Sequence, residues 1–260
     1  MPLTPLPGLE SFSLAALLWI TLVMALAGLV HGTLGLGFPL VATPLIAIVT
    51  DIKTAIVLVL LPCIAVVAVS ILKGGELRSV LRVYWPMPVC AFIGSTIGTH
   101  IYLAVDAAPF TLALAIVILV YLNLERLGKT NWPMLRKHRF AFGALFGLIS
   151  GLCDSTVNVA APPLIIYFMN LGLQPVIMVK ALNICFASGK VTQLANLLYA
   201  GNMAVATWLA TLPFAGLSIA TLLGGMAIRD LIDAATYRAW LKKALFVMAL
   251  VLVAQFVWQL

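Results

Sequence analysis

Long stretches without any charged residue constrain this chain more than any other feature of its sequence. No Asp, Glu, Lys or Arg occurs within seven stretches, at 11–50, 54–72, 83–105, 107–124, 155–179, 191–228 and 244–260. Several of these reach the ~20 residues that an α-helix needs to cross the hydrocarbon core of a bilayer. Only 9% of the residues are charged, whereas a soluble domain keeps roughly a quarter of its residues charged. So few charges cannot cover a water-facing surface, and the sequence therefore predicts an integral membrane protein.

The basic residues indicate how the chain is oriented. Of the 15 Lys and Arg residues, 12 fall into three clusters, which are Lys73/Arg78/Arg82, Arg126/Lys129/Arg136/Lys137/Arg139 and Arg229/Arg238/Lys242/Lys243. Short loops rich in Lys and Arg stay on the cytoplasmic side of a cell membrane, either the plasma or the inner membrane. The net charge of +7 is therefore a topology signal and no argument for nucleic-acid binding. The four cysteines lie scattered in apolar runs without CxxC spacing, so we expect neither a metal site nor a cofactor.

Ten apolar segments are predicted to be helices, which makes the fold class an all-α polytopic membrane protein. The first half of the chain contains the segments 13–31, 37–50, 54–72, 83–105 and 109–124. The second half contains 140–157, 159–173, 176–198, 204–227 and 241–258. No basic residue precedes the first apolar run, so we expect that run to be a retained helix and not a signal peptide.

The two halves of the chain resemble each other. The segment ALAGLVHGTLGLGFPLVATPLIA at 25–47 aligns without gaps to ALFGLISGLCDSTVNVAAPPLII at 144–166, an offset of 119. Internal repeats of this kind are typical of transporter folds. We therefore expect one membrane domain built from two repeats of five helical segments each, at 1–128 and 129–260, with a helix pair broken by Gly and Pro in each repeat.

The charges of equivalent loops predict that the repeats are inverted. The loop at 73–82 carries three basic residues and its counterpart at 199–203 carries none. The loop at 106–108 carries no basic residue, whereas its counterpart at 229–243 carries four. Equivalent loops thus face opposite sides of the membrane, and five crossings per repeat produce that inversion. The same count places both termini on the non-cytoplasmic side.

Two of the ten segments are too short to cross the membrane as straight helices. The segments 37–50 and 159–173 would be about 21–23 Å long, less than a ~30 Å hydrocarbon core. They follow two stretches of poor helix formers, GTLGLGFP at 32–39 and GLCDSTVN at 151–158. Backbone outside a helix at this depth persists only if it is buried in protein or lines a wet cavity. We therefore expect the two breaks to meet near the midplane.

The starts of the short helices predict a site for an anion in that cavity. Helices that begin near Phe38 and Val159 would present free N–H groups and positive dipole ends, and Asn158 is a good N-cap. Gly35 and Gly37 would let a ligand approach the backbone closely. In the alternative interpretation the glycines only allow tight helix packing, but their recurrence in both halves favours a site. The candidate substrate-binding residues at the breaks are Gly35, Gly37, Phe38, Pro39, Asn158 and Val159.

One later segment adds a buried charge to this site. Lys190 lies near the centre of the segment 176–198, and a charged residue at that depth is a functional candidate. Asn183, Ala187 and Lys190 share one helix face, which we expect to line the cavity. Lys190 either neutralises an anionic substrate or pairs with Asp154, which is the only acid inside a predicted span.

Three further polar residues have more than one interpretation. Asp154 is a proton carrier, a counter-ion or a residue of the external mouth. His31 ends the first helix beside the break, where it either couples proton movement or is a hydrogen-bonded structural residue. Lys180 lies about one turn from the cytoplasmic end of its segment, so we expect its ammonium group to extend to the interface.

The stretches GTLGLGFPLVATPLIA and GLCDSTVNVAAPPLII, with a glycine loop after the third segment of each repeat, resemble the sulfite exporter TauE/SafE family. The first copy keeps much of the family's pattern, in Gly32, Gly35, Gly37 and Pro44-Leu45. The second copy keeps Gly151 and Pro163-Leu164, but its middle glycines are replaced by Asp154, Ser155 and Thr156. The resemblance covers essentially the whole chain and implies transport of small sulfur oxyanions or organosulfonates, such as sulfite or sulfoacetate.

A secondary transporter of small anions that works by alternating access is the function these features favour. An anion channel is one alternative, and an intramembrane enzyme is another. Serine chemistry needs a nucleophile and a base within reach, whereas Ser188 and Lys190 are two residues apart on a helix and point away from each other. We therefore expect no enzyme activity. Proton coupling and a homodimer stay open.

Overall fold

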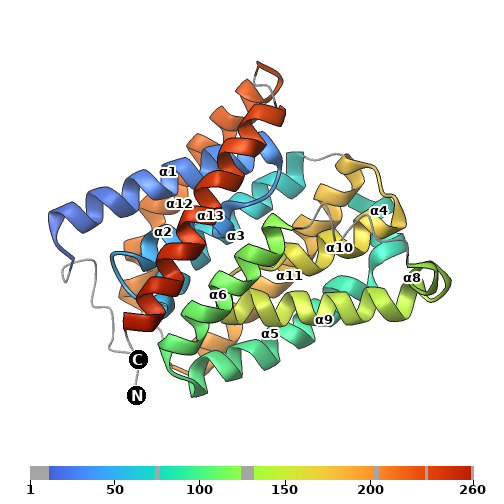
Figure 1. The fold of residues 1–260 in the computed structure, drawn as a ribbon, viewed down its shortest axis with the longest axis horizontal. Helices are drawn as coiled ribbons and strands as arrows, with labels where there is room; N and C mark the ends of the chain where they lie inside the picture. The colour runs from blue at the N-terminus through green and yellow to red at the C-terminus, as the bar shows by residue number, and fades with distance from the viewer. Residues whose placement is uncertain (1–11, 74–76, 124–131, 202–204, 232–233, 259–260) are drawn as a thin grey trace.

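All regular secondary structure in the described part of the chain is helical in the computed structural model (Figure 1). The structure describes residues 12–73, 77–123, 132–201, 205–231 and 234–258. The helices of the first half are α1 (Leu14–Leu34), α2 (Phe38–Ala47), α3 (Ile52–Lys73), α4 (Leu77–Tyr84), α5 (Pro86–Ala104) and α6 (Ala107–Leu122). The helices of the second half are α8 (Pro133–Lys137), α9 (Arg139–Val157), α10 (Ala161–Leu171), α11 (Pro175–Tyr199), α12 (Val205–Ile228), the 3-10 helix η2 (Arg229–Leu231) and α13 (Ala234–Trp258).

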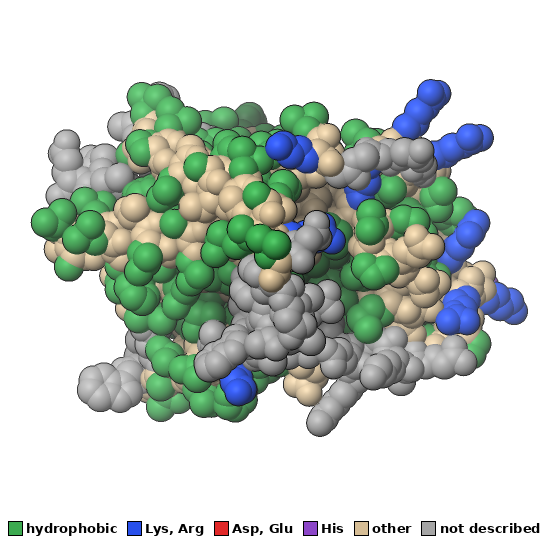
Figure 2. Space-filling model, turned by 90° about the horizontal axis from the view of Figure 1, so that it is seen from above, with side chains coloured by type: hydrophobic (Ala, Val, Ile, Leu, Met, Phe, Trp, Pro, Cys, Tyr) green, Lys and Arg blue, Asp and Glu red, His purple; other side chains and the backbone are tan. Residues whose placement is uncertain are grey.

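The predicted fold class, an all-α membrane protein, is confirmed. Each of the ten predicted segments overlaps one of the main helices. The described helices that are long and apolar enough to cross a membrane are Leu14–Leu34, Ile52–Lys73, Pro86–Ala104, Arg139–Val157 and Leu209–Ile228. Shorter apolar helices cover Phe38–Ala47, Ala107–Leu122, Ala161–Leu171 and Leu245–Ala254. Apolar side chains face outward on much of the surface, which suits lipid as the surrounding solvent (Figure 2).

Two short helices, α4 and α8, lie where the sequence predicted only loops. In α4 the sequence LRSVLRVY buries Val80 and leaves Arg78 and Arg82 exposed. A helix of this amphipathic kind rests at a membrane surface instead of crossing it. The following helix begins at Pro86, slightly later than predicted, because proline suits the first turn of a helix.

The short helices α2 and α10 turn back along the helices that precede them. The indole Nε1 of Trp19 near the start of α1 donates to the carbonyl oxygen of Leu45 near the end of α2, at 2.8 Å. In the second half, the Tyr167 hydroxyl near the end of α10 donates to the carbonyl oxygen of Arg139 at the start of α9, also at 2.8 Å. Each broken pair is therefore a helical hairpin with one long arm and one short arm.

The long arm of each hairpin packs on a helix of the other half. Helix α1 packs along α12, and α9 packs along α5. Glycines allow both contacts: Gly28 lies against the Ser218 carbonyl oxygen of α12, and Gly151 lies against the Ala91 carbonyl oxygen of α5. Close backbone approach at small residues is a common way for helices to associate in a membrane.

The basic residues gather toward one end of the molecule. Helix α1 begins and α13 ends at the left-hand end in Figure 1, whereas α4 and α8 lie at the right-hand end. Most of the Lys and Arg side chains visible in Figure 2 lie toward the same right-hand end. We call this the basic end of the molecule, and it is formed by α4, α8 and the start of α9.

A substitution at a helix crossing tests this packing. A Cβ added to Gly151 would overlap the Ala91 carbonyl oxygen, whereas a Cβ on Gly216 would have no heavy atom within 4 Å. We expect Gly151→Ala to lower the free energy of unfolding by about 1–3 kcal/mol, the usual cost of overpacking. The control Gly216→Ala is expected to be neutral or slightly stabilising, since alanine is the better helix former. Unfolding of the purified protein by SDS in micelles measures both, and equal losses would contradict the proposed crossing.

Candidate functional site

The two chain breaks are short and use the same backbone conformation. Helices α1 and α9 run to Leu34 and Val157, so the breaks are reduced to residues 35–37 and 158–160. Gly35 directly follows the first helix with a φ of 77°, and Asn158 directly follows its counterpart with a φ of 63°. Glycine adopts this left-handed region freely, and asparagine is one of the few other residues that tolerate it.

This equivalence corrects the gapless alignment of the two halves. The positions 35 and 158 are 123 residues apart, four more than the offset of 119. Helix α9 therefore runs about one turn further than α1 before its break. Asp154, which the alignment paired with Gly35, lies in this additional turn of helix.

One prediction about the second break is wrong. Helix α10 begins at Ala161, two residues after Val159, but Asn158 is the C-cap of α9 and not the N-cap of α10. The N-cap of α10 is Ala160, which makes no side-chain capping bond. In the first copy, α2 begins at Phe38 as predicted.

The breaks meet at one small cavity inside the molecule. Its walls come from the first hairpin (Gly37, Pro39 and Leu40), the second hairpin (Asp154, Val159, Ala160 and Ala161), and Cys63 of α3 with Phe186 of α11. Its volume is about 10 Å³, counted for the centres of water-sized spheres. A cavity of that size holds about one water molecule. The structure thus brings together Gly37, Pro39 and Val159 from the predicted site.

The two short helices offer unequal numbers of hydrogen-bond donors to this cavity. The first N–H groups of a helix have no acceptor inside the helix. In α2 the groups of Phe38 and Leu40 remain, since Pro39 has no N–H. In α10 two prolines occupy the first turn, at 162 and 163, which leaves the N–H of Ala161. The positive end of α2 is therefore the better one for an anion.

Lys190 lies behind the cavity wall, fully buried, at the centre of a polar network. Its ammonium Nζ is 3.1 Å from Asp154 Oδ1, and this is the only salt bridge among the residues that the structure describes. It also donates to the Asp154 carbonyl oxygen at 3.0 Å, to Gln193 Oε1 at 2.9 Å and to Asn158 Oδ1. Lys190 thus binds the last turn of α9 as well as its capping residue, where carbonyl groups lack helical partners.

The carboxylate of Asp154 is only partly satisfied. Its Oδ1 pairs with Lys190, but its Oδ2 makes no hydrogen bond within the described ranges of the chain. Oδ2 lies against Gly189 of α11, where an added Cβ would approach it to 2.5 Å. A glycine is therefore needed at 189 to leave room for this acid.

Asn183 holds the first break from the same face of α11. Its Nδ2 donates to the Gly35 carbonyl oxygen and to the Val179 carbonyl oxygen, both at 2.9 Å. Asn183 and Lys190 are seven residues apart, about two helical turns, so one face of α11 contacts both breaks. The second break is also joined to α2, because Asn158 Nδ2 donates to Thr43 Oγ1 at 2.7 Å.

The His31 ring is fully buried and interacts with the side chain of Asn183, which lies on α11. Lys180 does not adopt the role that was considered for it. The Lys180 side chain is only 6% exposed, so it is buried in the protein instead of extending from the helix to the interface.

Two members of the network were missing from the predicted site. Gln193 lies three residues after Lys190 on α11, so helical spacing alone could have identified it. Thr43 contacts Asn158 across 115 positions of sequence, and no local pattern signals such a contact.

A double-mutant cycle tests the buried pair. Lys190→Met leaves the Asp154 carboxylate buried without its cation, so we expect a loss of about 3–5 kcal/mol in the free energy of unfolding. Adding Asp154→Asn to Lys190→Met is expected to recover part of that loss, because no uncompensated charge remains. SDS titration in micelles measures each variant, with Lys73→Met on the surface as the control, expected within about 0.5 kcal/mol of the parent. Strictly additive effects would contradict the pairing.

One of three comparisons with known proteins found a match. A search of curated proteins and a search of solved structures each found no match. The family model described as "Sulfite exporter TauE/SafE" matches residues 20–256, which is nearly the whole chain and includes both hairpins. The chain therefore belongs to the sulfite exporter TauE/SafE family.

Proposed function

We propose that this protein is a secondary transporter that carries small anions across a cell membrane, with sulfite or organosulfonates of the sulfoacetate type as substrates. Membership of the family supports transport of this general class. The observation that carries the proposal is the convergence of two helix N-termini and of Asp154, which is paired with Lys190, on one cavity. Helix N-termini bind anions through free N–H groups and their positive dipole ends.

In this proposal Asp154 acts as the internal anion of the empty site. Its carboxylate lies on the cavity wall beside the starts of α2 and α10, and it neutralises Lys190. A substrate anion that enters would compete with Asp154 for the ammonium group and for the N–H groups of Phe38 and Leu40. The substrate is therefore bound through an exchange of anionic partners, which leaves the buried charge of Lys190 compensated throughout.

Proton coupling follows naturally from this exchange. Protonation of Asp154 would neutralise the competing carboxylate and release Lys190 for the substrate. His31, buried next to Asn183 at the first break, is the second candidate for carrying a proton. Both residues are close to the breaks, where movement of a proton and movement of the hairpins would affect each other.

Alternating access requires the site to open, because the cavity of about 10 Å³ is smaller than a sulfur oxyanion. The described conformation is therefore the closed one in our proposal. The repeats 1–128 and 129–260 would be inverted. The packing of α1 on α12 corresponds to that of α9 on α5, as expected if a pseudo-two-fold axis relates the repeats, and this supports the proposal. The contact of α3 with α12 corresponds in the same way to the contact of α11 with α5.

The orientation follows from the basic end of the molecule. Short basic loops stay in the cytoplasm, so we place α4 and α8 on the cytoplasmic side of the cell membrane. The start of α1 and the end of α13 lie at the other end, which supports the proposal that both termini face the non-cytoplasmic side (Figure 1).

The enzyme alternative finds little support in the geometry. The Ser188 hydroxyl donates to the Pro88 carbonyl oxygen at 2.7 Å, while Lys190 is directed toward Asp154. These two side chains therefore do not form a nucleophile–base pair.

Anion binding should respond in opposite directions to substitutions of the buried pair. Lys190→Gln is expected to weaken binding by about 10- to 100-fold, the loss of a charge-assisted hydrogen bond, whereas Asp154→Asn is expected to tighten it by removing the competing carboxylate. Thermal stabilisation of the purified protein by sulfite, sulfate, thiosulfate, short sulfonates and carboxylates gives the affinities. Lys180→Gln is the matched control on the same helix and should change binding less than Lys190→Gln. Stabilisation by a cation and by none of the anions would contradict the proposed site.

Flux measurements distinguish a carrier from the channel alternative. Proteoliposomes loaded with unlabelled substrate should take up labelled substrate by counterflow, with a rate that saturates as the substrate concentration rises. A sustained single-channel current under the same conditions would be incompatible with alternating access.

A further inference from the structure

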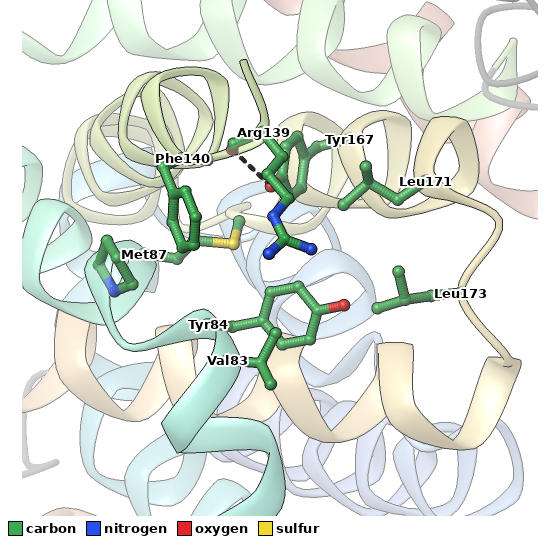
Figure 3. A pocket seen from close by; sticks show the side chains of 10 residues that line it. Val83, Tyr84, Met87, Arg139, Phe140, Tyr167, Leu171 and Leu173 are labelled. Carbon is green, nitrogen blue, oxygen red and sulfur yellow. Dashed lines mark hydrogen bonds between the residues drawn. The ribbon is translucent and has the colours of Figure 1, made fainter. Parts of the chain in front are cut away.

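A second pocket lies at the basic end of the molecule, away from the central cavity. It is enclosed by α4, α5, α9 and α10 and has a volume of about 140 Å³, counted for the centres of water-sized spheres. Figure 3 shows its walls, which are largely apolar and aromatic and include Val83, Tyr84, Met87, Phe140, Leu171 and Leu173. The transport proposal makes no use of this pocket.

Arg139 is the single cation among the lining residues. Its guanidinium group lies in the middle of the ring of labelled side chains, between Phe140 and Tyr84 (Figure 3). The guanidinium carbon is 4.9 Å from the centroid of the Phe140 ring. No carboxylate lies within ion-pair distance of Arg139 among the residues that the structure describes. Its charge is therefore not balanced by a described acid.

The hydroxyl of Tyr84 adds a hydrogen-bond donor beside this cation. Burial raises the pKa of Tyr84, and the nearby charge of Arg139 offsets only part of that rise. The phenol therefore keeps its proton under physiological conditions and can donate to an anion. An arginine and a protonated tyrosine together suit a phosphate group, since both donate hydrogen bonds.

The surroundings of the pocket indicate the boundary between membrane and water. Trp85 is 58% exposed and Trp132 is 39% exposed, and exposed tryptophans are typical of that boundary. The neighbouring helices α4 and α8 present further exposed basic side chains, which are Arg78, Arg82, Arg136 and Lys137. A cluster of this kind attracts the anionic lipids of the cytoplasmic leaflet.

We propose that this pocket binds an anionic phospholipid, with the phosphate on Arg139 and Tyr84 and an acyl chain along Leu171 and Leu173. A molecule of this class would pair its phosphate with the arginine and bury its acyl chain against the apolar walls. A free inorganic anion would contact the arginine but would leave most of the wall facing water. The proposal does not depend on the identity of the transported substrate.

The bound lipid would stabilise the open end of the second hairpin. At this end the Tyr167 hydroxyl donates to the Arg139 carbonyl oxygen at 2.8 Å, and Arg136 Nε donates to the Asn170 carbonyl oxygen at 3.1 Å. These bonds tie the end of α10 to the region where α8 meets α9. A lipid that bridges Arg139 and Leu173 would add a third connection between the same two arms.

Lipid-dependent stability of the full-length protein in micelles tests the proposal. Phosphatidylglycerol is expected to raise the melting temperature of the parent in a saturable manner, whereas phosphatidylcholine of the same chain length is not. Arg139→Gln should weaken the phosphatidylglycerol effect by at least about tenfold in concentration, the loss expected for a charge-assisted contact. Arg229→Gln makes the same charge change outside the pocket and should leave the effect within about twofold of the parent, a difference of only ~0.4 kcal/mol.

Three outcomes would overturn the assignment. Equal stabilisation by the two lipids would remove the role of charge, and an unchanged response in Arg139→Gln would place the lipid elsewhere. Equal stabilisation by inorganic phosphate would make the pocket a site for free anions. If Arg139→Gln does not fold, Leu173→Gln tests the apolar wall, and a phosphatidylglycerol response equal to that of the parent would then overturn the proposal.

Discussion

The buried ammonium group of Lys190 is the charge around which the centre of this protein is organised. A charged side chain in the middle of a membrane protein is costly unless it is paired and fully hydrogen-bonded. Asp154 supplies the opposite charge, while Gln193 and Asn158 accept the remaining hydrogen bonds. The same contacts satisfy the carbonyl end of α9. One cation therefore compensates its own burial and also allows a helix to end inside the membrane.

The two halves stabilise their helix breaks by different interactions. The first break uses glycines in left-handed conformations and a neutral amide contact from Asn183. The second break uses Asn158 in the left-handed conformation together with the Lys190 charge. Because α11 provides both Asn183 and Lys190, a shift of this one helix would act on the two breaks at the same time. In a transporter, that arrangement would couple the movements of the hairpins.

The sequence was informative wherever local composition decides the structure. Apolar segments located the ten main helices, and the start of α2 at Phe38 was also predicted. The role of Asn158 was predicted wrongly, because it ends α9 and does not start α10. Lys190, which is distant in sequence, supports the last turn of α9. Thr43 could not have been identified from the sequence, because it is 115 positions away from its partner Asn158. Helices α4 and α8 were missed because short surface helices depend on contacts with the rest of the protein more than on their own propensity.

The exchange of helix partners between the halves has a consequence for how the protein is made. When the first half leaves the ribosome, α1 has no α12 to pack on, and α5 has no α9. The faces of Gly28 and Gly94, which later lie against backbone of the second half, then meet only lipid or other proteins. The first half is therefore incompletely packed in the membrane until the second half has been inserted.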